Sequence, residues 1–189
     1  MFEKLLKWDR ETFLYLNSLG IEKYDAFWSI VTDITTWIPL YLLFIFLFFY
    51  KTSSAEGLRK TSVFLALTIF ILLITDLTKN FVARLRPNND EEINALIRIL
   101  KSPMDYSFFS GHAASSFAIT VLVFLLLRKK YKWAILFFIW PLLFATSRIY
   151  VGVHFPLDIL VGIFVGVASG LLFYALYKRF LERKKIPVS

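Results

Sequence analysis

Long apolar segments separated by short polar stretches dominate the sequence. Five of them run near residues 27–50, 61–82, 112–127, 133–150 and 157–177. A helix of about 17–25 apolar residues is long enough to cross the hydrocarbon core of a bilayer. The third segment is short and opens on polar residues between Ser110 and Ser116, so we expect it to begin within a cavity. The pattern predicts an all-α bundle of about five transmembrane helices.

The first 25 residues follow a different pattern, with charges set among apolar residues that recur at helical spacing. No uninterrupted apolar core precedes a cleavage site, so the segment does not resemble a signal peptide. We interpret residues 1–25 as an amphipathic helix that lies in the membrane interface, packs on the rest of the fold, or does both. A long polar loop is expected near 83–111, with a short apolar stretch at 93–100 that is compatible with a small helix.

Composition supports a membrane protein. Hydrophobic residues make up 58% of the 189 residues, and 21 of them are Phe. Soluble domains carry about half apolar residues, so we expect one membrane-embedded domain spanning 1–189. The net charge of +8 fits membrane-flanking loops better than nucleic-acid binding. The absence of Cys and the presence of only two His argue against a thiolate or multi-histidine metal site.

The distribution of basic residues predicts the orientation. The loops at 51–60 and 128–132 and the C-terminal tail fall on one side, with twelve basic residues against two acidic ones, whereas the other side holds ten basic and twelve acidic residues. The positive-inside rule therefore predicts a cytoplasmic C-terminus and an outer 83–111 loop. The twelve basic residues are Lys51, Arg59, Lys60, Arg128, Lys129, Lys130, Lys132, Lys178, Arg179, Arg183, Lys184 and Lys185.

Three polar clusters interrupt the apolar pattern, all at the predicted outer ends of spans. Charged residues near membrane depth usually face a cavity and serve a function, and the topology brings these three clusters to one face of the membrane. The clusters lie within 79–158: Lys79 with Arg86 and Pro87; Ser110, Gly111 and His112; and Ser147, Arg148, His154 and Asp158.

The clusters carry complementary chemistry. Three basic side chains suit a tetrahedral dianion, and a helix that starts at Ser110 and Gly111 directs backbone N–H groups at an anion. If the last span begins early, the carboxylate of Asp158 orients one nitrogen of His154 and leaves the other nucleophilic. His112 then remains as a proton donor to a leaving oxygen.

These motifs resemble those of the type-2 phosphatidic acid phosphatase superfamily, integral-membrane lipid phosphatases whose site is similar to that of the vanadium haloperoxidases. The family pattern K-x6-R-P, P-S-G-H and S-R-x5-H-x3-D matches residues 79–87, 110–112 and 147–158. The resemblance implies a nucleophile, its carboxylate partner and a general acid, with no metal or other cofactor. The implied nucleophile is His154, its carboxylate partner is Asp158, and the general acid is His112. The implied phosphate ligands are Lys79, Arg86, Ser110, Gly111 and Arg148.

The chain departs from the family pattern in two ways. Phe109 stands where the family usually has Pro, which removes a fixed φ before the third span. Many members have six spans, and here the amphipathic segment replaces the first. Two further acids lie in or near spans: we expect Asp76 to pair with Lys79, and Asp33 to cap or pair near the outer surface.

The sequence therefore predicts a lipid phosphatase that acts through a phosphohistidine at the outer face of a bacterial cytoplasmic membrane. The expected substrates are undecaprenyl diphosphate, phosphatidylglycerol phosphate or a phosphate of lipid A. Nothing indicates an obligate protein partner. A phosphotransferase with the same site remains open. A channel or transporter is the competing class, but it would distribute charges through the membrane depth rather than at one end.

Overall fold

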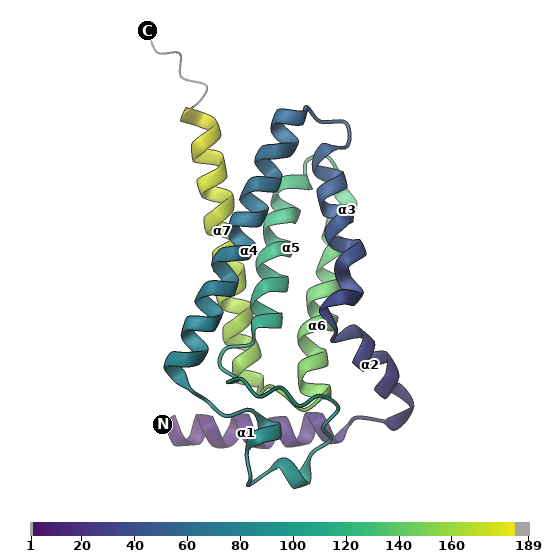
Figure 1. Ribbon diagram of the computed structural model, residues 1–189, viewed down its shortest axis with the longest axis vertical. Helices are drawn as coiled ribbons and strands as arrows, with labels where there is room; N and C mark the ends of the chain where they lie inside the picture. Colours follow the sequence, from purple (N-terminus) through teal and green to yellow (C-terminus); the bar gives the residue numbers. More distant parts are fainter. Residues whose placement is uncertain (1, 184–189) are drawn as a thin grey trace.

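The computed structural model describes residues 2–183, and every regular element in that range is a helix. The α-helices are α1 (Phe2–Ser18), α2 (Asp25–Val31), α3 (Ile38–Phe49), α4 (Ser54–Val82), α5 (Gly111–Leu127), α6 (Ile139–Tyr150) and α7 (Pro156–Arg183) (Figure 1). Short 3₁₀ segments lie at Glu22–Tyr24, Ile34–Trp37, Pro87–Asn89, Asn94–Leu96 and Lys132–Phe138. The predicted all-α fold is confirmed.

Three helical segments are long and apolar enough to cross a membrane: Ser54–Asn89, Lys132–Tyr150 and Pro156–Phe180. A bent pair, Glu22–Val31 with Ile34–Phe49, gives a fourth if it is counted as one span. Helix α5 is apolar but only 17 residues long. The chain is thus a membrane protein by length and composition, and the count of five spans stays a prediction.

The first predicted span, near 27–50, is broken by a bend of 62°. The break falls at Thr32 and Asp33, and the Asp33 side chain caps the next turn by accepting from the backbone N–H of Thr35 at 3.0 Å. This cap satisfies one backbone donor that the break leaves without a helical partner. The expectation that Asp33 caps a helix is therefore confirmed.

The span predicted at 133–150 consists of a 3₁₀ segment followed by α6. Pro141 lies in the first turn of α6, where a residue without a backbone N–H is tolerated because that donor has no partner in the helix. The chain before it is wound as the tighter 3₁₀ helix.

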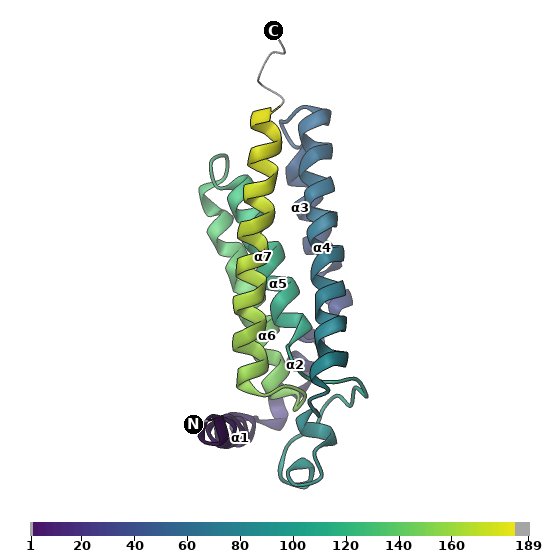
Figure 2. The ribbon, with the colours of Figure 1, turned by 90° about the vertical axis from the view of Figure 1, so that its left-hand side faces the viewer.

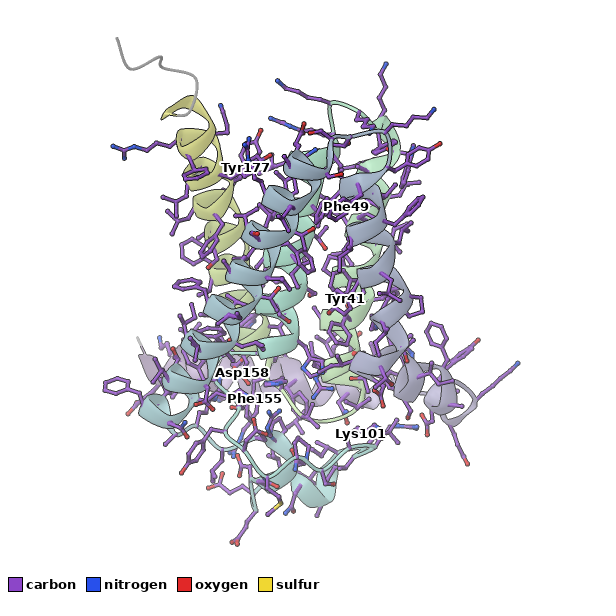
Figure 3. All side chains as sticks on the ribbon, turned by 45° about the horizontal axis from the view of Figure 1, so that its top comes forward. Tyr41, Phe49, Lys101, Phe155, Asp158 and Tyr177 are labelled. Carbon is purple, nitrogen blue, oxygen red and sulfur yellow. The ribbon has the colours of Figure 1, made fainter. Side chains whose placement is uncertain are left out.

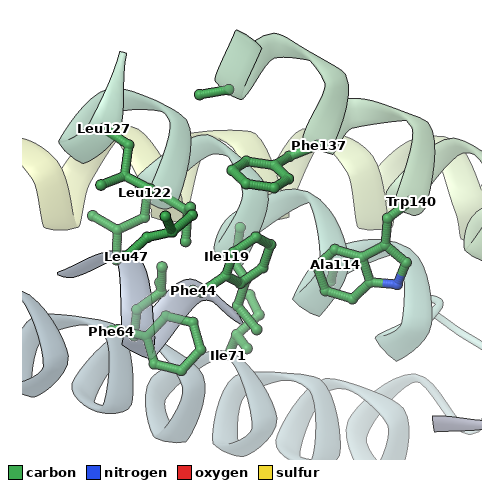
Figure 4. Close-up of a cluster of buried hydrophobic side chains, with 14 of the residues drawn as sticks. Phe44, Leu47, Phe64, Ile71, Ala114, Ile119, Leu122, Leu127, Phe137 and Trp140 are labelled. Carbon is green, nitrogen blue, oxygen red and sulfur yellow. The ribbon is translucent and has the colours of Figure 1, made fainter. Parts of the chain in front are cut away.

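Helices α5 and α7 pack closely at the centre of the bundle. A Cβ atom added at Gly162 would lie 2.7 Å from the carbonyl oxygen of Ser110, and one at Gly166 would lie 2.4 Å from that of Ala114. Small residues allow helix backbones to approach in this way within membranes. Around this pair the main apolar core joins α3, α4, α5 and α6, with Phe44, Ile71, Leu122 and Trp140 among its members (Figure 4).

Helix α1 lies across one end of the bundle (Figures 1 and 2). Its Phe13 and Asn17 are buried against the bundle, whereas Leu5, Leu6 and Trp8 are exposed. One face therefore packs on the protein, and the other leaves apolar side chains at the surface, which suits an interfacial helix.

Different loops lie at the two ends of the bundle. The long loop between α4 and α5 gathers at the same end as α1, and the 51–53 loop lies at the other end with the C-terminal part of α7 (Figure 1). The small helix expected at 93–100 is reduced to a 3₁₀ turn at Asn94–Leu96. Lys184 and Lys185, which contributed to the charge count, lie outside the described residues.

Candidate active site

All three polar clusters meet at the end of the bundle that α1 covers. The first begins in the last turn of α4 and continues beyond it, the second starts α5, and the third joins α6 to α7. Figure 3 shows Asp158, Phe155 and Lys101 at this end and Tyr177 at the other. The convergence that the topology predicted is therefore present in the structure.

Two of the predicted phosphate ligands share a carboxylate from the long loop. Lys79 Nζ donates to Asp105 Oδ2 at 2.5 Å, and Arg86 Nη2 donates to both carboxylate oxygens of Asp105, at 2.9 and 3.1 Å. Arg86 Nε also donates to the backbone oxygen of Asp105, at 2.8 Å. Burial opposes ionisation of Asp105, but the hydrogen bonds from Lys79 and Arg86 outweigh it and lower its pKa to about 2. An internal anion thus occupies two of the three basic side chains predicted to hold phosphate, Lys79, Arg86 and Arg148, which we call the clamp.

Arg86 also reaches the predicted nucleophile. Its Nη1 lies 2.9 Å from His154 Nε2 and donates to the backbone oxygen of Val153 at 3.0 Å. A guanidinium can only donate, so Nε2 accepts and the ring proton lies on Nδ1. His154 Nδ1 in turn lies 3.4 Å from Asp158 Oδ2, which also accepts from the backbone N–H of Phe155 at 2.9 Å. The imidazole therefore presents an unprotonated nitrogen to the cations, with a carboxylate behind it.

The local backbone explains this arrangement. Helix α7 begins at Pro156, so His154 precedes the helix and does not share a helical face with Asp158. The turn before α7 brings the two side chains together, and the Phe155 N–H fixes the carboxylate there. His154 is 1% exposed. Its burial, followed by the charges of Arg86, Arg148 and Lys79, lowers its pKa well below the ordinary value, which favours the neutral ring that a nucleophile requires.

The start of α5 supplies the second cluster. Ser110 caps the helix by accepting from the backbone N–H of Ala113 at 3.4 Å, and its own N–H donates to the backbone oxygen of Asp158 at 2.9 Å. That N–H is therefore not available to a phosphate, although the hydroxyl hydrogen remains a possible donor. A Cβ atom at Gly111 would lie 3.0 Å from the Thr75 side chain, so the residue type fits a close approach to α4.

Arg148, the third of the predicted phosphate-binding cations, borders an open cavity of about 300 Å³. Arg148 is 6% exposed and donates through Nη1 to Thr32 Oγ1 at the break of the first span. Its Nε has no hydrogen-bond partner within the described residues, although it is buried. An unpaired buried donor is costly, so this atom is suited to a ligand. The cavity is lined by Thr32, Asp33, Ile34, Lys101, Ser102, Pro103, His112 and Arg148.

Three charged residues at this site escaped the sequence prediction. Asp105 pairs with Lys79, and the prediction that Asp76 does so is wrong: Asp76 accepts from Asn80 instead, at 3.4 Å. Arg84 joins Asp158 to Asp9 of α1. Arg84 lies two residues before the Arg-Pro pair, which is the only sequence signal for it, and nothing in the local pattern marks Asp9 or Asp105.

Taken together, the arrangement offers cationic donors, a neutral imidazole backed by a carboxylate, and a second imidazole at a cavity. This combination suits nucleophilic attack on a phosphate with protonation of the leaving oxygen. Among the residues that the structure describes, no group of three or more His, Cys, Asp or Glu side chains could hold a metal ion.

Comparison with known proteins agrees with this chemistry. The model of the PAP2 superfamily matches residues 59–182. A lipid A 4'-phosphatase of Porphyromonas gingivalis is 32% identical over 93% of this chain and 75% of its own length. An undecaprenyl-diphosphatase of Sulfolobus acidocaldarius is 37% identical over 69% of this chain and 58% of its own length. The chain therefore belongs to the PAP2 superfamily and is a membrane lipid phosphatase of the PAP2 type.

A solved structure supports the fold. The PAP2-type phosphatidylglycerolphosphate phosphatase of Bacillus subtilis superposes with a TM-score of 0.72, covering 98% of this chain and 90% of its own. The two sequences are only 20% identical, so this similarity supports the fold alone.

Proposed function

We propose that this enzyme removes phosphate from a membrane lipid through a phosphohistidine formed on His154. The observation that carries the proposal is the orientation of the imidazole, with Nε2 2.9 Å from Arg86 Nη1 and Nδ1 3.4 Å from Asp158 Oδ2. A nitrogen that is unprotonated, and set among cations that attract a phosphate, is the nucleophile of an in-line displacement.

The reaction has two steps. When phosphate binds, Arg86 Nη1 turns from His154 Nε2 to a phosphoryl oxygen and frees the lone pair of Nε2. That lone pair attacks phosphorus, the bond from phosphorus to the lipid oxygen breaks, and His112 donates a proton to that oxygen. Water then attacks the phosphohistidine, His112 takes a proton from the water, and phosphate leaves from Nε2. The positive charge on the phosphorylated ring is stabilised by Asp158. Neither step requires a metal or another cofactor.

The clamp holds the phosphoryl oxygens during both steps. Lys79, Arg86 and Arg148 neutralise their charge, while the Ser110 hydroxyl and the Gly111 N–H donate from the start of α5. Substrate phosphate takes the place of the Asp105 carboxylate on the first two cations. Such preorganised donors supply much of the acceleration in phosphoryl transfer.

The first substrate candidate is a phosphate of lipid A. This choice rests on the relative that covers 93% of the chain and carries a lipid A 4'-phosphatase name. Undecaprenyl diphosphate is the second candidate, favoured by the relative at 37% identity. Phosphatidylglycerol phosphate follows as a third. Transfer of the phosphoryl group to a second lipid is the alternative outcome of the same intermediate.

The proposal includes the topology. Residues 1–189 form one domain in a bacterial cytoplasmic membrane, with five spans, the site facing the exterior and the C-terminus in the cytoplasm. The excess of basic residues in the loops opposite the site supports this orientation, because the site end and the basic loops lie at opposite ends of the bundle (Figure 1).

The test is an assay of phosphate release in detergent. Purified protein is incubated with equal concentrations of lipid A, undecaprenyl diphosphate and phosphatidylglycerol phosphate, and lipid products are followed by mass spectrometry. We expect loss of one phosphate from lipid A at the highest kcat/KM, and none with the His154→Ala variant. Release from none of the three lipids would refute the proposal, and phosphorylated acceptor lipid in place of free phosphate would support the transferase.

A further inference from the structure

Arg84 lies between two buried carboxylates near the nucleophile. Its Nη1 donates to Asp158 Oδ1 at 2.8 Å, and its Nη2 donates to Asp9 Oδ2 at 2.6 Å. Both carboxylates are 0% exposed, whereas the Arg84 side chain is 21% exposed. Removing a charged carboxylate from water is costly unless it is paired. One guanidinium therefore stabilises two buried anions.

The Asp9 carboxylate also connects α1 to the start of α7. Its Oδ1 accepts from the backbone N–H of Leu157 at 2.8 Å, in the first turn of the helix that carries Asp158. Nearby, the rings of Phe13 and Phe155 meet edge-on with centroids 5.3 Å apart. Helix α1 thus contacts the segment around His154 through both polar and apolar groups.

The chain reaches the position of Arg84, beside the two carboxylates, through a turn at the end of α4. Helix α4 ends at Val82, and the next residue, Ala83, adopts a left-handed conformation with φ of 50°. A non-glycine residue in that region is uncommon and costs of the order of 1 kcal/mol. The guanidinium then lies over the ring of Phe155, 4.2 Å from its centroid. Hydrogen bonds to Asp9 and Asp158 thus hold the edge of the guanidinium, and the Phe155 ring packs against its face.

The charges of this group suit the reaction. Burial raises the pKa of Asp9, with the hydrogen bonds from Arg84 and Leu157 opposing the rise. Two carboxylates and one guanidinium leave a single negative charge beside His154. That charge complements the positive ring formed when Nε2 bonds to phosphorus.

We propose that Arg84 and Asp9 are positioning residues that hold the Asp158 carboxylate ionised and rotated toward His154. Without Arg84, two buried carboxylates lose their common cation and one of them takes up a proton. A protonated Asp158 no longer stabilises a positive imidazole. The inference rests on the proposed role of His154 as nucleophile, and it gives α1 a part in catalysis.

A double-mutant cycle tests the proposal. We compare kcat and KM for lipid phosphate release in Arg84→Gln, Asp158→Asn and the double variant. Arg84→Gln is expected to lower kcat by about tenfold or more and to change KM by less than about threefold, because Arg84 does not touch substrate. In the Asp158→Asn background, the same substitution is expected to cost less than about twofold, because its target carboxylate is gone.

Two variants on α1 complete the design. Asp9→Asn keeps an oxygen acceptor for the Leu157 N–H but removes the charge, so kcat is expected to fall with little change in KM. The matched control is Arg10→Ala on the same helix, because Arg10 pairs with Asp90 and Glu92 of the long loop. We expect Arg10→Ala to keep the wild-type kcat. If Arg84→Gln does not fold, as judged by thermal unfolding in detergent, Asp9→Asn decides the question.

The outcomes separate the two proposals. Suppose that the wild-type protein releases phosphate but Arg84→Gln keeps the wild-type kcat, or lowers kcat by the same factor in the Asp158→Asn background as in the wild type. Either result refutes the positioning role and leaves the lipid phosphatase standing. An Asp9→Asn variant with wild-type kcat refutes the role of α1. If the wild-type protein releases phosphate from no lipid, the proposed function fails, and the positioning role fails with it.

Discussion

The carboxylate of Asp105 accepts two hydrogen bonds from Arg86 Nη2, at 2.9 and 3.1 Å, and so occupies a cation that the sequence assigns to phosphate. The same carboxylate holds Lys79. A phosphate bound to these cations, as proposed, displaces Asp105, so we expect this carboxylate to compete with substrate and with product for the clamp.

Removing this competitor is expected to tighten anion binding. For Asp105→Asn we expect the inhibition constant of vanadate, which imitates the five-coordinate transition state, to fall by about three- to tenfold, since a charge at a partly exposed site is worth on the order of 1 kcal/mol. The inhibition constant is measured from the inhibition of phosphate release by vanadate. Asp76→Asn is the matched control, because Asp76 accepts from Asn80 and not from Lys79. Weaker vanadate inhibition in Asp105→Asn would show that Asp105 organises the clamp rather than competing with phosphate.

Replacing the nucleophile is expected to abolish turnover. His154→Ala should lower kcat by about four orders of magnitude or more, because the remaining clamp cannot form the covalent intermediate. Rapid mixing with radiolabelled lipid, quenched in base, should show a base-stable, acid-labile phosphoprotein in the wild type and none in the variant. Thermal unfolding checks that the variant is folded. A labelled His154→Ala protein would place the nucleophile elsewhere.

The role of His112 depends on the leaving group. His112→Ala should slow esters of weakly acidic alcohols far more than esters of acidic phenols, because only the former need a proton as the bond breaks. A graded series of soluble aryl and alkyl phosphates, compared by kcat/KM, measures this. Losses of equal size across the series would indicate that His112 binds phosphate and donates no proton.

The pH dependence follows from the environment of His154. Burial, followed by the charges of Arg86, Arg148 and Lys79, lowers its pKa. The neutral ring is the attacking form, so activity rises with pH through this pKa and the acidic limb of kcat/KM should lie below about pH 6.5. Two substrates whose phosphates ionise at different pH provide the control, because a limb that belongs to His154 does not move between them. A limb above pH 6.5 with both substrates would contradict the proposed state of the histidine.

The orientation can be tested with single cysteines, because the natural sequence has none. Glu91 is exposed in the long loop at the site end, and Ser54 is exposed at the start of α4, at the opposite end. In sealed right-side-out vesicles, a membrane-impermeant thiol reagent should label Glu91→Cys and leave Ser54→Cys unlabelled until detergent is added. The reverse pattern would place the site, and its substrate, at the cytoplasmic leaflet.

The sequence by itself determined the fold class and the residue types that gather at the candidate site. Apolar runs of the length that a bilayer requires located α4, α5 and α7, but they did not predict the break in the first span or the 3₁₀ winding of Lys132–Phe138. The start of α5 at Gly111 was predicted to within one residue, because capping by Ser110 is a local interaction. His112, His154 and Asp158 were visible because polar residues at membrane depth stand out against an apolar background.

The tertiary structure decided how those groups are paired. Asp105 and Asp9 lie in the long loop and in α1, 26 and 75 residues from their partners Lys79 and Arg84, and no local periodicity connects residues so far apart. Sequence proximity suggested Asp76 for Lys79, but the bundle places the loop carboxylate there instead. The contact between Arg148 and the Thr32 hydroxyl at the bend likewise joins residues 116 positions apart. Residue type is fixed by the chain, whereas the partner of a buried charge is fixed by which distant segment the packing brings within hydrogen-bonding distance.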